Sequence, residues 1–259
     1  MIRAQALLSF TRAPWPILFA LAGLGLILSV RNVGSATLPA ICGSAAPWLQ
    51  VASGWRDALQ FVFVFNPPAL LLADWALMLL AMMPPLLAMP LMHVYWSSLP
   101  RRRVRALACF VGAYGSVWLA AGPILIALAV LLRLVAGSMA LAFVGALLIA
   151  LVWSACPWQR DALNRGHRMG RIGLFGWAAD RECLTLGFTH AFWCVASCWS
   201  WMLLPLESGS WHVAAMAAAG VGMLSDRLSI PQQPRWRLPG VLGFVDVRLL
   251  FHQRQGAKP

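Results

Sequence analysis

Six long apolar segments alternate with short polar segments along the chain. Each apolar segment is close to, or longer than, the roughly 20 residues that a helix needs to cross about 30 Å of hydrocarbon. We therefore predict an all-α, polytopic membrane protein, a bundle of about six transmembrane helices that forms one integral membrane domain over residues 1–259. The expected spans are about residues 14–30, 69–94, 106–132, 139–156, 183–206 and 211–228.

The basic residues predict the orientation of these spans. With the N-terminus inside, the inner segments hold 17 of the 20 Lys and Arg residues, and the outer segments hold 3. This distribution satisfies the positive-inside rule at every loop. Both termini are therefore expected in the cytoplasm, with 229–259 as a cytoplasmic basic tail, in a multi-pass protein of a bacterial inner (plasma) membrane.

Composition agrees with this prediction and excludes other classes of protein. The chain is 61% hydrophobic and only 11% charged, about half the charged fraction of a soluble domain. The net charge of +12 sits in short loops beside the lipid bilayer, which does not favour nucleic acid as a partner. The six cysteines are scattered, mostly in or next to apolar segments, and do not form a disulfide framework.

The segments outside the spans carry further expectations. Residues 1–12 and the first span resemble a signal peptide, but the apolar run is long and its cleavage site poor, which favours a signal anchor. Residues 57–65 are too short to span and are expected at the membrane interface, as is the tail patch 241–251. Residues 133–137 are predicted as a tight turn, and 157–182 as a polar basic segment.

The second span carries two unusual features. Pro84 and Pro85 lie in its middle, where prolines are expected to kink a transmembrane helix. Asp74 lies near its outer end, and carboxylates within spans are functional candidates, although this one could equally snorkel to the interface.

The fifth span contains a stripe of metal-ligand residue types in the sequence HAFWCVASCWSWM. His190, Cys194, Cys198 and Met202 each follow the previous one by four residues. A step of four advances only ~40° around a helix, so the four side chains share one face. They cover ~18 Å of helical rise, which is too far for one ion. Cys194 and Cys198 alone could hold one soft ion, Cu(I) or Zn(II), completed by another helix.

Other soft or borderline ligands recur along the chain. Met82 and Met83 on the second span, and Met and His residues on the sixth, resemble a path for a soft metal, although Met is also an ordinary filler of helix packing. Cys156 and Cys183 flank the polar basic segment, His167 lies within it, and the three could converge at the cytoplasmic surface. No CxxC is present, and the same segment also fits a loop against anionic headgroups.

Signatures of catalysis are missing from the sequence. It has no GxSxG, HExxH or P-loop, and no pair of carboxylates shares a predicted face with a histidine. We therefore expect the protein not to be an enzyme.

Four segments together resemble an uncharacterised bacterial family that is catalogued as predicted metal-binding integral membrane proteins. The segments are WALMLLAMMPPLL (75–87), RRRVRALACFVGAYGSVWLAAG (101–122), CPWQRDALNRGHR (156–168) and GFTHAFWCVASCWSWMLLP (187–205). The resemblance covers roughly 75–228 and implies a metal-binding role. Its motifs match at Met82, Met83, Cys194, Cys198, Met202 and His167. Ala162 and Gly166 depart from it, since family members often carry Cys there, so the fifth-span pair is the better candidate.

The preferred interpretation is a membrane protein that binds Cu(I) or Zn(II) for sequestration, delivery or transport. The predicted metal-ligand candidates are Cys194, Cys198, His190, Met202, Met82, Met83, Cys156 and His167. A metal donor or acceptor protein, or a membrane partner subunit, would then be the partner. The alternatives are a scaffold or accessory subunit without metal, and a small-solute transporter that uses Asp74. A metal or packing role requires that Cys194 and Cys198 face the interior of the bundle.

Overall fold

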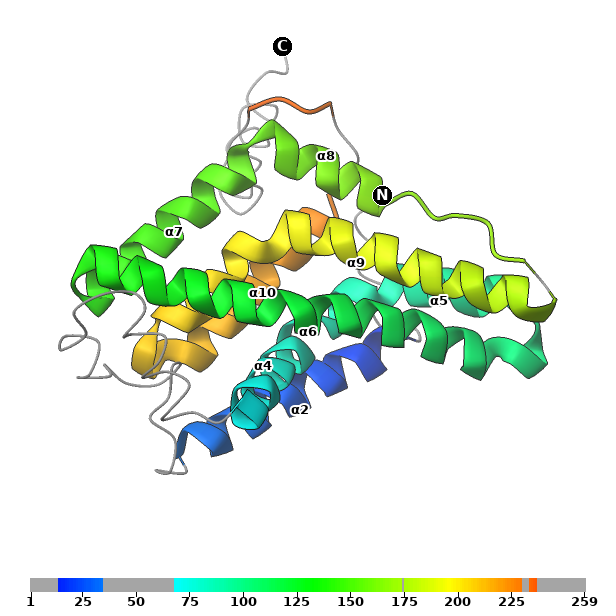
Figure 1. The fold of residues 1–259 in the computed structure, drawn as a ribbon, viewed down its shortest axis with the longest axis horizontal. Helices are drawn as coiled ribbons and strands as arrows, with labels where there is room; N and C mark the ends of the chain where they lie inside the picture. The colour runs from blue at the N-terminus through cyan, green and yellow to red at the C-terminus, as the bar shows by residue number, and fades with distance from the viewer. Residues whose placement is uncertain (1–13, 35–67, 174, 230–232, 237–259) are drawn as a thin grey trace, which may run out of the picture.

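The computed structural model describes residues 14–34, 68–173, 175–229 and 233–236. Over these residues the protein is all-α, with eight α-helices and three short 3-10 helices (Figure 1), which confirms the predicted class. The α-helices are α2 (Trp15–Gly34), α4 (Pro68–Met82), α5 (Ala88–Ser97), α6 (Arg103–Ala136), α7 (Met139–Ala155), α8 (Pro157–Gly166), α9 (Gly176–Glu207) and α10 (His212–Arg227). The 3-10 helices are η2 (Pro84–Leu87), η3 (Pro100–Arg102) and η4 (Gly209–Trp211).

The centre of the fold is the pair α6 and α9, which run side by side in the same direction (Figure 1). Gly187 of α9 lies against α6 so closely that a Cβ there would be 2.6 Å from the Phe110 carbonyl oxygen and 2.8 Å from the Ala113 Cβ. Small residues permit such close approach between helices in apolar surroundings. Glycine at this position therefore fixes how near the two helices lie.

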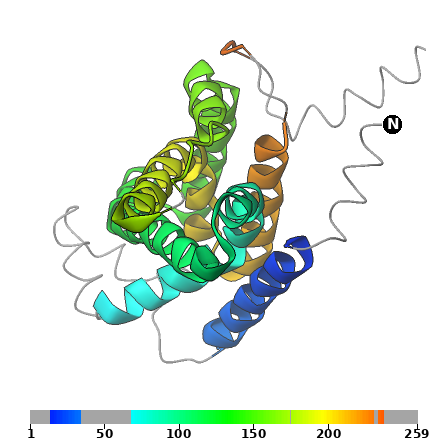
Figure 2. The same ribbon diagram turned by 90° about the vertical axis from the view of Figure 1, so that its right-hand side faces the viewer.

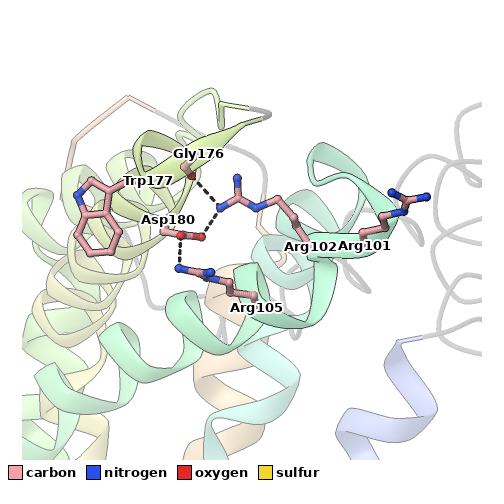
Figure 3. A pocket seen from close by; sticks show the side chains of 6 residues that line it. All are labelled: Arg101, Arg102, Arg105, Gly176, Trp177 and Asp180. Carbon is pink, nitrogen blue, oxygen red and sulfur yellow. Dashed lines mark hydrogen bonds and ion pairs between the residues drawn. The ribbon is translucent and has the colours of Figure 1, made fainter.

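An ion-pair cluster joins the starts of α6 and α9. Asp180 lies between two arginines, with Arg102 Nη2 at 2.6 Å from Oδ1 and Arg105 Nη2 at 2.7 Å from Oδ2 (Figure 3). Arg102 also donates to the Gly176 carbonyl at 2.8 Å, at the first residue of α9. Because the Asp180 side chain is only 5% exposed, the two cations compensate for much of the hydration that its carboxylate has lost.

A second ion pair joins the ends of the same helices. Arg133 Nε donates to Glu207 Oε2 at 2.7 Å, and Arg133 also donates to the Leu206 carbonyl. The Glu207 side chain is fully buried, and that of Arg133 is 6% exposed. The parallel pair is therefore held at both ends, start to start and end to end.

The predicted kink of the second span is confirmed. The helix breaks after Met82, continues as η2 through Pro84 and Pro85, and resumes as α5, with a bend of 59°. Proline lacks an amide hydrogen and clashes with the preceding turn, which explains the break. The bend buries Met82 and Met83 in the main hydrophobic core, where each is at most 3% exposed.

Helices α7 and α8 form a second bent pair, with a change of direction of 68° at Cys156 (Figure 1). Ser138 caps the start of α7 by accepting a hydrogen bond from the Leu141 amide at 3.2 Å. Pro157 begins α8, where a missing amide hydrogen is tolerated. At the opposite edge, α2 packs on α4 and touches α10 (Figure 2).

The described helices give one to three candidate membrane spans, where the sequence pattern predicted six. Pro100–Ala136 alone is long and apolar enough, and two bent pairs, α4 with α5 and α7 with α8, pass together. The apolar part of α2, Trp15–Arg31, is too short, and α10 has 16 residues. Helix α9 is long, but its charged start and its Ser, Thr, His and Trp residues dilute its hydropathy.

Two boundaries also differ from prediction. The tight turn expected at 133–137 is instead the last turn of α6, which ends in left-handed Gly137 with φ 68°. The polar segment 157–182 contains the short helix α8 and the first residues of α9, which therefore begins before the predicted boundary at 183. The expectations for 1–12, 57–65 and 241–251 lie outside the described residues.

Arg133→Ala should destabilise the fold strongly, because it leaves the Glu207 carboxylate buried without its cation. Removing one partner of a buried pair costs about 3–5 kcal/mol. Thermal unfolding of the protein in detergent measures this change. The matched control is Arg165→Ala, because Arg165 pairs with Asp161 at 2.9 Å with both side chains more than 40% exposed. Such a surface pair contributes about 0–1 kcal/mol. An equal loss of stability in both variants would contradict the structural role of the buried pair.

Candidate functional site

The predicted stripe of α9 faces the interior of the molecule. Cys194 and Met202 are fully buried, Cys198 is 3% exposed and His190 is 4% exposed. The five cysteines in the part of the chain that the structure describes are free thiols. Cys194 and Cys198 interact directly with one another, as expected for side chains one turn apart. The interior position that a metal or packing role requires is thus present.

Tyr114 of α6 connects Cys194 with the kinked second span. Its hydroxyl lies 3.2 Å from Cys194 Sγ and donates to Met83 Sδ at 3.5 Å. The tyrosine is buried, as are both sulfur-bearing residues. The break at Pro84 thus brings a thioether into the same small region as the two thiols of α9. Of the two neighbouring methionines, Met83 has this link to the cysteines.

Arg227, the last residue of α10, contributes a positive charge that the sequence pattern did not reveal. Its side chain is 8% exposed. The guanidinium interacts electrostatically with Cys194, Cys198 and Tyr114. Within the described residues, its three buried nitrogens make no hydrogen bond to an oxygen or nitrogen atom, and their partner is the Cys194 sulfur. A buried cation without a full set of partners is costly, so an anion beside it would be strongly stabilised.

The end of α8 holds Arg227 in this position. A Cβ on Gly166 would lie 2.5 Å from Arg227 Nη1, so any larger residue there would require the guanidinium to shift. His167 Nε2 lies 3.0 Å from the Arg227 carbonyl oxygen, and its Nδ1 lies 2.6 Å from the Leu163 carbonyl oxygen. His167, predicted as a metal ligand, thus contacts two backbone carbonyls and fastens α8 to the end of α10.

The remaining predicted candidates lie apart from this cluster. Met202 is two turns beyond Cys194 on α9, and Cys156 lies at the junction of α7 and α8. Cys183 is buried near Asp180, at the ion-pair cluster. No group of three or more His, Cys, Asp or Glu residues that could hold a metal occurs in the described ranges. The structure therefore does not bring Cys156, His167 and Cys183 together.

Three tryptophans of α9 lie close to the thiols in sequence and pack on neighbouring helices or side chains. Trp201 is 6% exposed and packs on Gly222 of α10. Trp199 contacts Trp153 of α7 edge to face, with ring centroids 5.2 Å apart. Trp193 lies nearer the surface, under the guanidinium of Arg165 at 4.7 Å. Such bulky apolar rings limit the access of water to the buried sulfur atoms.

This arrangement suits a soft, singly charged cation. Thiolate and thioether sulfur are the ligands that Cu(I) prefers, whereas structural Zn(II) takes four ligands from Cys, His or carboxylates. The cluster offers two thiols, one thioether and a compensating guanidinium. It offers no third thiol or imidazole at the same depth, because His190 lies one turn away along α9.

Fold and site together define an all-α protein with candidate membrane spans and a buried pair of thiols. The family model described as PpoB2, copper chaperone, matches residues 72–247, and the protein belongs to this family. The matched range contains the whole thiol cluster, including Arg227. Family membership indicates copper binding or delivery, a non-catalytic role, and a protein that accepts copper. No curated protein and no solved structure matches the chain.

Gly187→Ala should loosen the contact between Tyr114 and Cys194. The added methyl group would overlap the Phe110 carbonyl, so α6 and α9 must separate. Overpacking of this kind costs about 1–3 kcal/mol. We therefore expect faster alkylation of Cys194. Mass spectrometry of the peptide that contains Cys194 measures this rate.

The matched control for this prediction is Gly112→Ala. Gly112 is on the same α6 helix, and a Cβ there would meet nothing within 4 Å. Its alkylation rate should equal that of the wild type. If Gly187→Ala also left the rate unchanged, the close approach at Gly187 would not control access to Cys194.

Proposed function

We propose that this protein binds one Cu(I) ion between Cys194 and Cys198 and passes it to an acceptor protein. The observation that carries the proposal is the buried guanidinium of Arg227, which interacts with two buried thiols and lacks a full set of hydrogen-bond partners in the described residues. Family membership supports copper as the metal.

Charge balance favours copper(I) at this site over zinc. Two thiolates and Cu(I) carry a net charge of −1, which the +1 charge of Arg227 cancels. Two thiolates and Zn(II) are neutral, so the guanidinium would remain an uncompensated buried cation. Zinc would also lack the further ligands that complete its tetrahedral sites. The copper(I) dithiolate is thus the species that neutralises the whole cluster.

The ligand set also favours delivery of copper over permanent storage. Two thiolates leave Cu(I) open to a third sulfur ligand, and Met83 is the neighbouring thioether, with its Sδ in contact with the Tyr114 hydroxyl. A thiol or thioether of an acceptor could take the same open position before either protein thiolate leaves. Exchange through such three-coordinate species requires no free copper ion.

The cellular setting of this activity is also a proposal. The apolar helices and the basic loops fit a multi-pass protein of a bacterial inner membrane, with both termini and the basic tail 229–259 in the cytoplasm. A six-span arrangement would need α9 and α10 to cross the membrane as part of the bundle. In that arrangement the other helices would cover the polar side chains of α9.

Cys194→Ser combined with Cys198→Ser should abolish copper binding. Anaerobically purified wild-type protein loaded with Cu(I) is expected to keep about one copper ion per chain, measured by elemental analysis, and the double variant none. Cys183→Ser is the matched control, since Cys183 is a buried thiol on the same helix but lies near Asp180. Wild-type protein with reduced thiols that retained no copper would disprove the proposal. The scaffold alternative would be favoured if the double variant lost stability or a partner while its copper content equalled that of the wild type.

Arg227→Gln should weaken copper binding while Arg227→Lys largely preserves it. Glutamine removes the compensating charge, and the loss of an outer partner of a metal site typically lowers affinity about 10- to 100-fold. Competition with a chromophoric Cu(I) chelator measures the change. Because lysine restores charge but not the shape of the guanidinium, a better affinity for Arg227→Lys than for Arg227→Gln separates electrostatics from packing. An unchanged affinity of Arg227→Gln for Cu(I) would refute the idea that Arg227 compensates the charge of the copper dithiolate.

A further inference from the structure

A pocket of about 480 Å³ opens between the end of α8 and the middle of α9. It is lined by Asp161, Arg165, Arg168, Leu186, Thr189, His190 and Trp193. His190 is the innermost of the titratable residues in this lining, because it is only 4% exposed. Nothing in the dithiol site itself requires this pocket.

His190 connects the pocket with the buried thiols. Its Nε2 is buried and has no hydrogen-bond partner in the part of the chain that the structure describes. The ring packs against both Phe110 and Tyr114, each with its centroid 6.1 Å away. Cys194 follows one turn later on α9 and lies 3.2 Å from the hydroxyl of the same Tyr114. A buried imidazole nitrogen without a partner in the described residues therefore belongs to a residue that lines the pocket and lies one turn before the first thiol.

The charges around the pocket favour an anion. Asp161 pairs with Arg165 at 2.9 Å, and the Arg165 guanidinium also covers the Trp193 ring. Arg168 has no ion pair within the described ranges, which leaves the lining with a net charge of +1. The buried Arg227 lies behind the same wall, close to Gly166. A bare Cu(I) ion would be repelled on this route, whereas a negatively charged complex would be attracted.

We propose that this pocket is the loading port for copper, and that it receives Cu(I) as an anionic complex with two small-molecule thiolates. The inference rests on the proposed function, since it assumes that Cys194 and Cys198 are the destination. Arg165 and Arg168 attract the complex, and His190 Nε2 is the first protein ligand to the metal.

The transfer balances without any change of oxidation state. His190 Nε2 adds to the copper of the incoming complex as a neutral ligand. Cys194 Sγ then forms a bond to copper while one bond to a carrier thiolate breaks, and the thiol proton passes to that leaving thiolate. Cys198 repeats the exchange with the second carrier thiolate, and His190 is released. The products are the protein dithiolate of Cu(I), with its charge of −1, and two neutral carrier thiols.

The test compares loading from two copper donors of opposite charge. Full-length protein in detergent is mixed anaerobically with either the Cu(I)–glutathione complex, which is anionic, or the acetonitrile complex of Cu(I), which is cationic. The rate of loading is followed by rapid quenching and copper analysis. Arg165→Gln with Arg168→Gln should load at least about tenfold more slowly from glutathione, the lower range of electrostatic steering effects. Its rate from acetonitrile should be unchanged or higher.

Three further variants sharpen this comparison. Arg171→Gln with Arg181→Gln removes the same charge from exposed positions outside the pocket lining and should change neither rate. Asp161→Asn removes the acidic residue of the lining and should accelerate loading from glutathione. His190→Ala should slow loading from both donors while the final copper content stays at one ion per chain.

The outcomes separate the port from the site itself. Equal slowing of the arginine variant with both donors, or no slowing with glutathione, would overturn the port. Wild-type loading rates in His190→Ala would remove His190 from the route. Loss of bound copper at the end point in wild-type protein would instead refute the dithiol site, whatever the rates.

Discussion

The fixed register of α6 against α9 is the constraint on which the site depends. Asp180 holds the start of the pair, Glu207 holds its end, and Gly187 sets how near the helices lie. A shift of one residue along α9 would rotate Cys194 by ~100° away from α6. The contact of 3.2 Å between Tyr114 and Cys194 exists only in this register. Ion pairs at two places more than two dozen residues apart thus determine the surroundings of one thiol.

Buried charge is the second organising feature, and it joins helices that are distant in sequence. Arg227 ends α10, lies beneath Gly166 of α8, and interacts with both thiols of α9. In the metal-free protein these thiols are weak partners for Arg227, because neutral thiols are poor hydrogen-bond acceptors. The fold therefore holds a site whose electrostatics improve once the thiols become thiolates around a cation of charge +1. Under the proposed function, this asymmetry between the empty and loaded states favours the capture of copper.

The sequence predicted those parts of the fold that depend on neighbours along the chain. The kink at Pro84, the helix over 139–155 and the inward-facing pair Cys194 and Cys198 follow from local chemistry and from helical period. The start of α9 at Gly176 was missed because Arg181 and Glu182 look like loop residues until Asp180 is seen to pair with α6. Six spans were expected because apolar content signals burial in protein as strongly as it signals burial in lipid.

Arg227 shows why the most informative residue of the site escaped sequence reasoning. In the sequence it opens a run of basic tail residues, and the positive-inside rule explains it fully. Only the fold reveals that its side chain turns inward and lies against Gly166, sixty-one positions earlier. Ala162 and Gly166 were judged as lost thiol positions from the family resemblance. In this chain Gly166 has a different use: it exchanges a possible sulfur ligand for a fixed positive charge. If the proposed site holds copper, two thiolates and one guanidinium balance its charge with few bonds to the metal, so few bonds must break when the copper leaves.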